Sequence, residues 1–322
     1  MRIAFIGGTR FIGHAAAERA ISRGHDVAVL HRGDHACEVA GARDFKVDRS
    51  DPEALRMALR DARAEVVVDT RAMTAAHAET SAAVIASLHV PVVVLSSQDV
   101  YAQFGALNGH PAPRIDEAVR EDAPLTVPFP FRGIHDHEGG PDYDKKDVER
   151  TFLAACSRVI VLRLPAVFGK RDPHRRFGML VDTIDRTQRK HAKCILSCHR
   201  GASLRWTHAH VADVGHAIVL ATESARDGVN GVFNVGEPET PTMKERAEKI
   251  ARALNVTIEW NETNDLPKAW ELFGAQPNDF IADDTKLRDV LGFREVLTEK
   301  ARIQDLIGWA RATRKPTPSE RW

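Results

Sequence analysis

Glycines crowd the turn that follows the first apolar run of the chain. The run Ile3–Ile6 leads directly into GGTRFIG at residues 7–13, and apolar residues recur at helical spacing from Ile12 onward. A diphosphate group needs backbone N–H groups and close approach at a helix N-terminus, so the contact points must lack side chains. Because this glycine cluster stands between a strand and a helix, it predicts a dinucleotide-binding turn.

Two further segments carry hydroxyl and amine groups suited to proton transfer. In LSSQDVY, Ser97 ends a β-branched run, and a hydroxyl at the carboxyl end of a central strand points into the crevice where ligands bind. The chain has only two tyrosines, Tyr101 and Tyr143, and Tyr143 precedes a helix that begins near Lys145 and Lys146. A tyrosine transfers protons near neutrality only if its pKa of ~10 falls by about three units, which a neighbouring ammonium group favours.

Short β-branched runs alternate with helical patterns in the first half of the chain, which is typical of a parallel sheet covered by helices. Strands are predicted at Ile3–Ile6, Val27–Leu30, Phe45–Val47, Val66–Asp69, Val92–Leu95, Val159–Leu164 and Val232–Val235. From about Lys170 to Ala202, and from Glu237 to the end, helical patterns occur without matching strands. We predict an α/β fold, a Rossmann doubly wound parallel sheet with a smaller, interleaved C-terminal substrate lobe. The dinucleotide-binding domain then comprises residues 1–168 and 205–236, and the substrate lobe comprises residues 169–204 and 237–322.

Charge and composition exclude several classes of protein. The 322 residues hold 45 basic and 45 acidic side chains, so the basic excess of a nucleic-acid binder is absent. Four cysteines do not make a disulfide framework and indicate a reducing compartment. Apolar runs stay far below the ~20 residues of a membrane-spanning helix, and the N-terminal run is too short for a signal peptide. We therefore expect a cytoplasmic protein that binds neither nucleic acid nor membrane.

Together, these motifs resemble those of the extended short-chain dehydrogenase/reductase superfamily, whose bacterial members are often called NAD-dependent epimerase/dehydratase proteins. The resemblance extends to VLRLPAVFG at residues 161–169, RWTHAHVADV at 205–214 and DTKLRDVLGF at 284–293, and so covers essentially the whole chain. Arg10 occupies the middle glycine position of the family turn G-x-x-G-x-x-G, which is similar to an atypical branch that includes chloroplast stem-loop-binding proteins. The resemblance implies an enzyme with a nicotinamide cofactor.

In this superfamily a tyrosine acts as the general acid and a lysine four residues later binds the cofactor, but Y-x-x-x-K does not occur at Tyr143. Two alignments remain open. Anchoring on Glu149, which the family places four residues after its lysine, selects Lys145 and leaves Pro141 at the usual tyrosine position. Anchoring on Tyr143 instead selects Lys146, three residues on and on the same helical face. We favour the first alignment, with Tyr143 acting from the preceding loop, and the implied catalytic residues are Ser97, Tyr143 and Lys145.

Cofactor choice is set at the end of the second strand, where an acidic residue binds the adenosine ribose hydroxyls and repels a 2′-phosphate. His31 and Arg32 stand there instead, and Arg10 is able to reach the same corner, so we predict that NADP is preferred over NAD. A solvated Arg32 without a ligand is the alternative. The resemblance adds positions for adenine, pyrophosphate, ribose and nicotinamide, so that the candidate cofactor-binding residues are Gly7, Thr9, Arg10, Phe11, Ile12, Gly13, His31, Arg32, Asp48, Thr70, Arg71, Ser96, Lys145 and Pro165.

The second half of the chain bears on the substrate. Ala166 replaces an asparagine that many sugar-nucleotide epimerases use on their substrate, which argues against a nucleotide sugar. The basic run Lys170–Arg176 either holds an anionic substrate group or is a solvated loop. We predict no metal site, because zinc-ligand spacing is not met by Cys194, Cys198 and His199 or by His135 and His137.

The predicted function is hydride transfer on a small or sugar-like carbonyl or alcohol by an NAD(P)-dependent oxidoreductase or epimerase/dehydratase of the atypical extended type. Two alternatives stay open. The broken Y-x-x-x-K and the presence of Arg10 favour a non-catalytic NAD(P)-binding regulator or redox sensor, whereas kinship with the chloroplast proteins suggests an RNA-binding protein of the same fold. Superfamily habit implies a homodimer.

Overall fold

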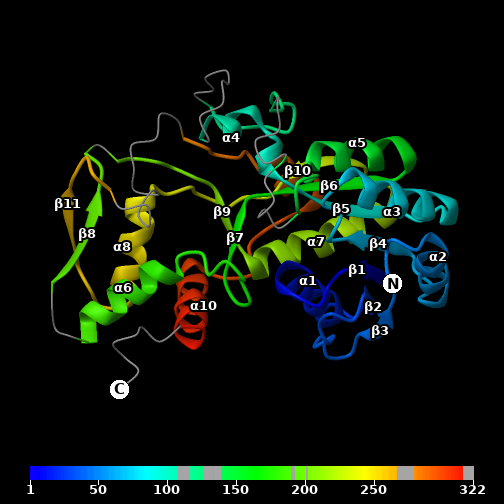
Figure 1. Ribbon diagram of the computed structural model, residues 1–322, viewed down its shortest axis with the longest axis horizontal. Helices are drawn as coiled ribbons and strands as arrows, with labels where there is room; N and C mark the ends of the chain where they lie inside the picture. The colour runs from blue at the N-terminus through cyan, green and yellow to red at the C-terminus, as the bar shows by residue number, and fades with distance from the viewer. Residues whose placement is uncertain are drawn as a thin grey trace.

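Two lobes make up the protein (Figure 1). The computed structural model describes residues 1–107, 117–126, 133, 139–189, 193–200, 202–266 and 279–314. The larger lobe is a sheet with helices on both faces, and the smaller lobe holds α8 and the β8–β11 pair, at the left of the view.

The larger lobe is built on a seven-stranded parallel sheet of order β10-β6-β5-β4-β1-β2-β3. Its strands are β1 Arg2–Ile6, β2 Asp26–His31, β3 Arg43–Lys46, β4 Val66–Asp69, β5 Val92–Ser97, β6 Val159–Leu164 and β10 Gly231–Asn234. All the strands predicted from the sequence are present, with ends that differ by two residues or fewer. The central strands are buried throughout, as expected for β-branched runs covered on both faces. The predicted α/β fold class is confirmed.

Helices cover the two faces of this sheet. On one face lie α1 (Phe11–Ser22) and α7 (Val211–Arg226), and on the other lie α2 (Pro52–Asp61), α3 (Ala75–Leu88) and α5 (Lys145–Ala155). Local signals set their ends: the Asp51 carboxylate accepts hydrogen bonds from the N–H groups of Glu53 and Ala54 at the start of α2. Gly24, with φ +81°, follows the end of α1 in the left-handed conformation that a glycine adopts without strain.

The strand order reverses beside β1, which has β2 on one side and β4 on the other. In a doubly wound sheet, the loops that leave such neighbouring strands diverge to opposite faces and open a crevice at the carboxyl ends. Ile6, at the end of β1, lies opposite Leu30 of β2 and Asp69 of β4. The glycine turn after β1 therefore stands at the mouth of this crevice.

The smaller lobe has its own hydrophobic core, to which α6 (Gly178–Arg189), α8 (Met243–Ala253) and α10 (Glu299–Ala312) contribute. It also contains β8 (Cys194–Cys198) and β11 (Ile258–Glu262), which pair in parallel. The prediction that these parts of the chain carry helices without strands is therefore wrong. Each strand is five residues long, and β11 carries mostly polar residues with none of its side chains buried, so its hydrophobic pattern is too weak to predict a strand.

A two-stranded pair, β7 (Ala166–Phe168) and β9 (His208–His210), lies between the lobes (Figure 1). Downstream, α9 (Thr285–Leu291) packs back onto the larger lobe, and Leu287, Leu291 and Phe293 share its core with β1, β6 and α7. The division into residues 1–168 with 205–236 and residues 169–204 with 237–322 stays a proposal. Among the described residues, every helix is too short or too polar to cross a membrane.

Candidate active site

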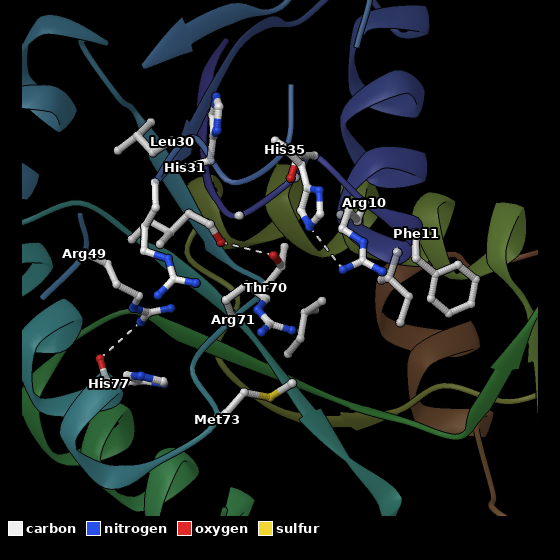
Figure 2. Close-up of a pocket in the computed structure, with 18 of the residues that line it drawn as sticks. Arg10, Phe11, Leu30, His31, His35, Arg49, Thr70, Arg71, Met73 and His77 are labelled. Atoms are coloured by element: carbon white, nitrogen blue, oxygen red, sulfur yellow. Dashed lines mark hydrogen bonds between the residues drawn. The ribbon is translucent and has the colours of Figure 1, made fainter. Parts of the chain in front are cut away.

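A cavity of about 550 Å³ opens at the carboxyl ends of β1, β2, β4 and β5. Figure 2 shows part of it, with side chains from several loops pointing toward one another. The structure brings into its wall every residue that the sequence predicted for catalysis or cofactor binding, namely Gly7, Thr9, Arg10, Phe11, Ile12, Gly13, His31, Arg32, Asp48, Thr70, Arg71, Ser96, Ser97, Tyr143, Lys145 and Pro165. Their individual roles remain predictions.

The glycine turn at the wall of this cavity has no room for side chains at Gly7 and Gly13. Gly7 has φ +83°, and a Cβ built on it would lie 2.4 Å from Thr70 Oγ1 and 2.7 Å from Arg71 Cγ. A Cβ on Gly13 would lie 2.8 Å from the Cα of Gly8. Residues with side chains therefore cannot replace Gly7 or Gly13 without moving backbone or neighbours. The two glycines therefore let the turn pack tightly against itself and against the loop that follows β4.

The N-terminus of α1 faces the same cavity. Arg10 stands at the N-cap and makes no capping hydrogen bond with its side chain, and the first helical turn lacks acidic residues. Instead, Arg10 Nη1 lies 3.3 Å from Nε2 of His35, in the loop after β2, as Figure 2 shows. The N–H groups of the first turn are thus left uncapped by side chains within the described structure, and the positive end of the helix favours an anion there.

At the predicted adenosine corner, β2 ends at His31 and Arg32 follows it, and both side chains have acidic partners. His31 Nε2 lies 2.5 Å from an oxygen of Asp44, and Arg32 pairs with Asp34 at 2.7 Å on the exposed surface. Asp48, the predicted adenine ligand, accepts two hydrogen bonds from Ser50, which lower the pKa of the Asp48 carboxyl. This corner therefore carries His31 and Arg32 next to the carboxylates of Asp34, Asp44 and Asp48.

A buried ion pair between Arg49 and Asp69, which was not predicted from the sequence, lies next to this corner of the cavity. The Asp69 carboxylate is fully buried and accepts hydrogen bonds from Arg49 Nη1 at 3.0 Å and Nη2 at 2.7 Å, and from the N–H groups of Arg71 and Ala72. Burial alone would raise the pKa of Asp69, but the charge and hydrogen bonds of Arg49 outweigh it and lower that pKa. Arg49 itself lines the cavity. The only sequence signal was an aspartate that ends an otherwise apolar strand.

Of the two candidate lysines, Lys145 is the one in the cavity wall. It is buried in the first turn of α5, and its Nζ donates hydrogen bonds to the carbonyl oxygens of Ala72 at 2.6 Å and Leu95 at 2.9 Å. Burial lowers the pKa of Lys145 to about 8, although Asp99 and Asp69 act in the opposite direction. Lys146 Nζ instead donates to the Thr126 carbonyl at 2.5 Å.

Tyr143 lies in the loop before α5 and is 4% exposed. Its hydroxyl donates a hydrogen bond to Asp99 Oδ2 at 2.9 Å, and the N–H of Asp99 donates to Ser97 Oγ at 3.3 Å. Burial raises the pKa of Asp99 to about 6. Asp99, which carried no signal in the sequence, thus links two of the three predicted catalytic residues, Tyr143 and Ser97.

The anchor of the favoured alignment, Glu149, has a structural role. Its carboxylate forms a buried ion pair with Arg163 of β6, at 2.8 and 3.0 Å, and accepts a hydrogen bond from Ser96 Oγ at 2.5 Å. Arg163 also donates to the hydroxyl of Tyr101, which donates in turn to Asn234. Burial raises the pKa of Tyr101 to about 12, so this tyrosine is poorly suited to proton transfer. Ser96 lines the cavity, but its hydroxyl is engaged by Glu149.

The basic run after β7 is largely paired with acids. Arg171 pairs with Glu38 at 2.8 Å, and two further arginines pair with Asp182 and Asp172. From this run, His174 and Arg176 line the cavity. Among the residues that the structure describes, groups of three or more metal-ligating side chains are absent. His135 and His137 lie outside the described residues.

The N-terminal third of the chain is similar in sequence to a known protein family. Residues 3–113 match the family model for the NAD dependent epimerase/dehydratase family. The chain matches no curated protein. The match confirms the resemblance drawn from the motifs and, with it, the prediction of an enzyme.

Solved structures extend the likeness to the whole fold. A UDP-glucose 4-epimerase superposes with a TM-score of 0.72 at 17% identity, covering 97% of this chain and 98% of the other. The dTDP-glucose 4,6-dehydratase of Bacillus anthracis, in complex with NAD, gives a TM-score of 0.67 at 16% identity, covering 97% of each chain. The UDP-glucose 4-epimerase of Thermotoga maritima, with UDP-glucose, gives 0.67 at 18% identity, covering 97% of this chain and 99% of the other.

Proposed function

We propose that this chain is an NAD(P)-dependent oxidoreductase or epimerase/dehydratase, which transfers hydride between a nicotinamide cofactor and a small or sugar-like alcohol or carbonyl. One observation carries the proposal. The glycine turn at the start of α1 and the Ser97, Tyr143 and Lys145 side chains line a single cavity at the switch point of the sheet. That arrangement supports a diphosphate at one end and proton transfer at the other.

The residues present fit a dinucleotide. The uncapped N–H groups at the start of α1 suit a diphosphate, and Gly7 and Gly13 let the turn before this helix pack tightly at the cavity wall. Lys145, which lines the same cavity, would hold the ribose next to the nicotinamide. The cofactor, when bound, supplies a carbon that accepts or returns hydride.

The chain's own groups then handle the substrate oxygen. Ser97 Oγ, at the end of β5, orients that oxygen, and the Tyr143 hydroxyl exchanges a proton with it. Lys145 holds the loop after β4 and the end of β5 in place through the hydrogen bonds from its Nζ to the carbonyl oxygens of Ala72 and Leu95. Because Tyr143 is buried, its hydroxyl has little contact with solvent water.

Two finer features belong to the same proposal. NADP is the preferred cofactor, because Arg10 and Arg32 flank the adenosine corner and β2 ends without a carboxylate, although Arg32 has Asp34 as a partner. The substrate carries an anionic or sugar-like group that His174 and Arg176 meet at the cavity wall. The protein acts in the cytoplasm, as a homodimer of the superfamily type.

The test is turnover measured in two ways. Purified protein is incubated with NADP(H) or NAD(H) and a panel of aldehydes, ketones, sugars and sugar nucleotides that includes UDP-glucose. Absorbance at 340 nm follows net redox, and proton NMR follows epimerisation or dehydration, in which the cofactor is regenerated. Turnover that Tyr143→Phe slows at least about a hundredfold supports the proposal. Tight cofactor binding without turnover on any member favours the non-catalytic regulator, and unchanged turnover in Tyr143→Phe removes that residue from the chemistry.

A further inference from the structure

Asp99 lies directly behind Tyr143, as seen from the cavity. Tyr143 lines the cavity, whereas Asp99 lies outside the lining formed by the described residues and is 7% exposed. A 2.9 Å hydrogen bond runs from the Tyr143 hydroxyl to Asp99 Oδ2. The second oxygen, Oδ1, is buried and has no hydrogen-bond partner among the residues that the structure describes.

The fold holds this pair in place from both sides. Asp99 belongs to η1 (Gln98–Val100), a short turn that follows β5, and Ser97 Oγ accepts a hydrogen bond from the Asp99 N–H. On the other side, the ring of Tyr143 rests against Gly139, where a Cβ would lie 2.2 Å from the ring atom Cδ2. A glycine at 139 therefore permits the position from which Tyr143 reaches both Asp99 and the cavity.

The charges around Asp99 come from α5. Lys145 is the nearby cation and lowers the pKa of Asp99, whereas Glu149 raises it and is itself neutralised by Arg163. Burial outweighs these effects and brings the pKa of Asp99 to about 6. At neutral pH the carboxylate is therefore mostly ionised and remains able to take up a proton.

A carboxylate that accepts the hydrogen bond of a tyrosine hydroxyl makes it harder for that tyrosine to ionise and act as a base. A nearby negative charge disfavours the phenolate, so it hinders Tyr143 from becoming a base by itself. The same carboxylate offers a place for the phenol proton to go. A proton relay through Tyr143 needs no free phenolate at any stage.

We propose that Asp99 is the proton acceptor behind Tyr143 in the reaction of the proposed function, on which this inference rests. As the carbinol carbon gives its hydride to the oxidised nicotinamide, the substrate O–H bond breaks and its proton moves to Tyr143 Oη. The Oη–H bond breaks at the same time, and that proton moves to Asp99 Oδ2. The alcohol becomes a carbonyl, the cofactor becomes reduced, Tyr143 stays neutral and Asp99 becomes a carboxylic acid. Asp99 acts through Tyr143 and is therefore a positioning residue.

The first arm of the test needs neither cofactor nor substrate. Carboxyl-labelled aspartate is incorporated into the wild type, Asp99→Asn and Tyr143→Phe, and carbon-13 NMR follows each carboxyl from pH 4 to 8. The resonance missing in Asp99→Asn is expected to titrate near pH 6, and to titrate higher in Tyr143→Phe, because the tyrosine hydrogen bond lowers the pKa of Asp99. A resonance that titrates near the ordinary value for aspartate, or that ignores the loss of Tyr143, overturns the proposal.

The second arm uses the pH profile of kcat/KM for alcohol oxidation. The wild type is expected to lose activity as pH falls through about 6, since a protonated Asp99 cannot accept the proton. Asp99→Asn is expected to be at least about a hundredfold slower and to lack this limb. If Asp99→Asn is slower but its kcat/KM still falls below about pH 6 as in the wild type, Asp99 has only a structural role and the proposal is wrong. Absence of wild-type turnover would overturn the proposed function and the relay with it, whereas wild-type turnover that Asp99→Asn leaves unchanged would overturn the relay alone.

Discussion

Burial acts in opposite directions on the pKa values of Lys145, in the cavity wall, and of Asp99, the partner of Tyr143. It lowers the pKa of Lys145 to about 8 and raises the pKa of Asp99 to about 6, while the attraction between their charges opposes both shifts. Each group therefore exchanges its proton closer to neutrality than it would in water. That property suits an acid–base site and is costly in a purely structural one.

The raised pKa of Asp99 has a consequence for stability that a substitution can reveal. A carboxyl whose pKa rises from 3.8 to about 6 on folding favours the folded state only while protonated. This stabilisation is complete below about pH 4 and is lost as pH rises through 6. Asp99→Asn removes the buried charge, so we expect the free energy of unfolding in urea at pH 8 to increase by about 1 to 3 kcal/mol.

Asp185→Asn is the matched control for this experiment. Burial of Asp185 is outweighed by the guanidinium groups of Arg311 and Arg314, which lower the pKa of the Asp185 carboxyl. Its ionised form therefore stabilises the fold above the unfolded pKa, and the variant is expected to be less stable than the wild type at pH 8. Loss of stability in both variants would contradict the assignment of a costly charge to Asp99.

The adenosine corner yields a second prediction at this scale. If Arg32 leaves Asp34 to meet a 2′-phosphate, Arg32→Gln should weaken NADPH binding about tenfold and change NADH binding less than about twofold. Fluorescence titration with both cofactors measures this, with Arg60→Gln on the exposed face of α2 as the control. Tighter binding of NADH by the wild type, or an equal loss for both cofactors, would refute the NADP preference.

Short sequence motifs predicted the residues that line the cavity, but they did not predict the side chains that form hydrogen bonds and ion pairs around it. Glycines, a strand-end serine and a tyrosine near a lysine each carry a signal within a few residues. The contacts of Asp69 with Arg49 and of Asp99 with Tyr143 join residues 20 and 44 positions apart, so no local pattern reveals them. Their positions depend on how the strands and α5 pack together.

At the scale of elements, α5 is fastened to the sheet by one buried ion pair. Glu149 on the helix binds Arg163 on β6, and each side chain is 5% exposed. Removing one charge of such a pair leaves the other buried without compensation. We expect Glu149→Gln to lower the free energy of unfolding by about 3 to 5 kcal/mol in urea titrations.

A surface pair on the same helix provides the comparison. Arg150 is 75% exposed where it pairs with Asp147, and Arg150→Gln should change stability by less than about 0.5 kcal/mol. Similar effects of the two substitutions would mean that the Glu149 pair does not fasten α5.

The strands show which elements a sequence pattern predicts and which it does not. Apart from β3, which is mostly charged, the strands of the large sheet are largely apolar runs between turn and helix signals, and the ends of each strand were predicted to within two residues. In contrast, β8 and β11 are strands of only five residues in the smaller lobe, and three of the five residues of β11 are polar. Their pairing comes from the lobe that surrounds them, so periodicity alone does not show it.

At the scale of the molecule, the larger lobe and the smaller lobe are joined through α7. This helix packs against α1 so closely that a Cβ on Gly215 would lie 3.0 Å from the backbone of Ala15. Its first turn holds Asp213, which binds Arg302 of α10. The helix α1, at the cavity, is therefore linked through α7 to the smaller lobe, so we expect binding of the proposed cofactor to stabilise both lobes together.

Calorimetric titration of NADPH and NADH into the wild type and Gly13→Val examines the dinucleotide cavity itself. The Cβ of a valine at 13 would press on the Gly8 backbone at the mouth of the cavity. Gly308→Ala, in an open position on α10, is the control, and circular dichroism confirms that each variant is folded. Binding of at least one cofactor by the wild type and by Gly308→Ala, with at least about tenfold weaker binding by Gly13→Val, is the expected result. Absence of binding to either cofactor, or equal binding by a folded Gly13→Val, would show that the glycine turn does not hold a dinucleotide.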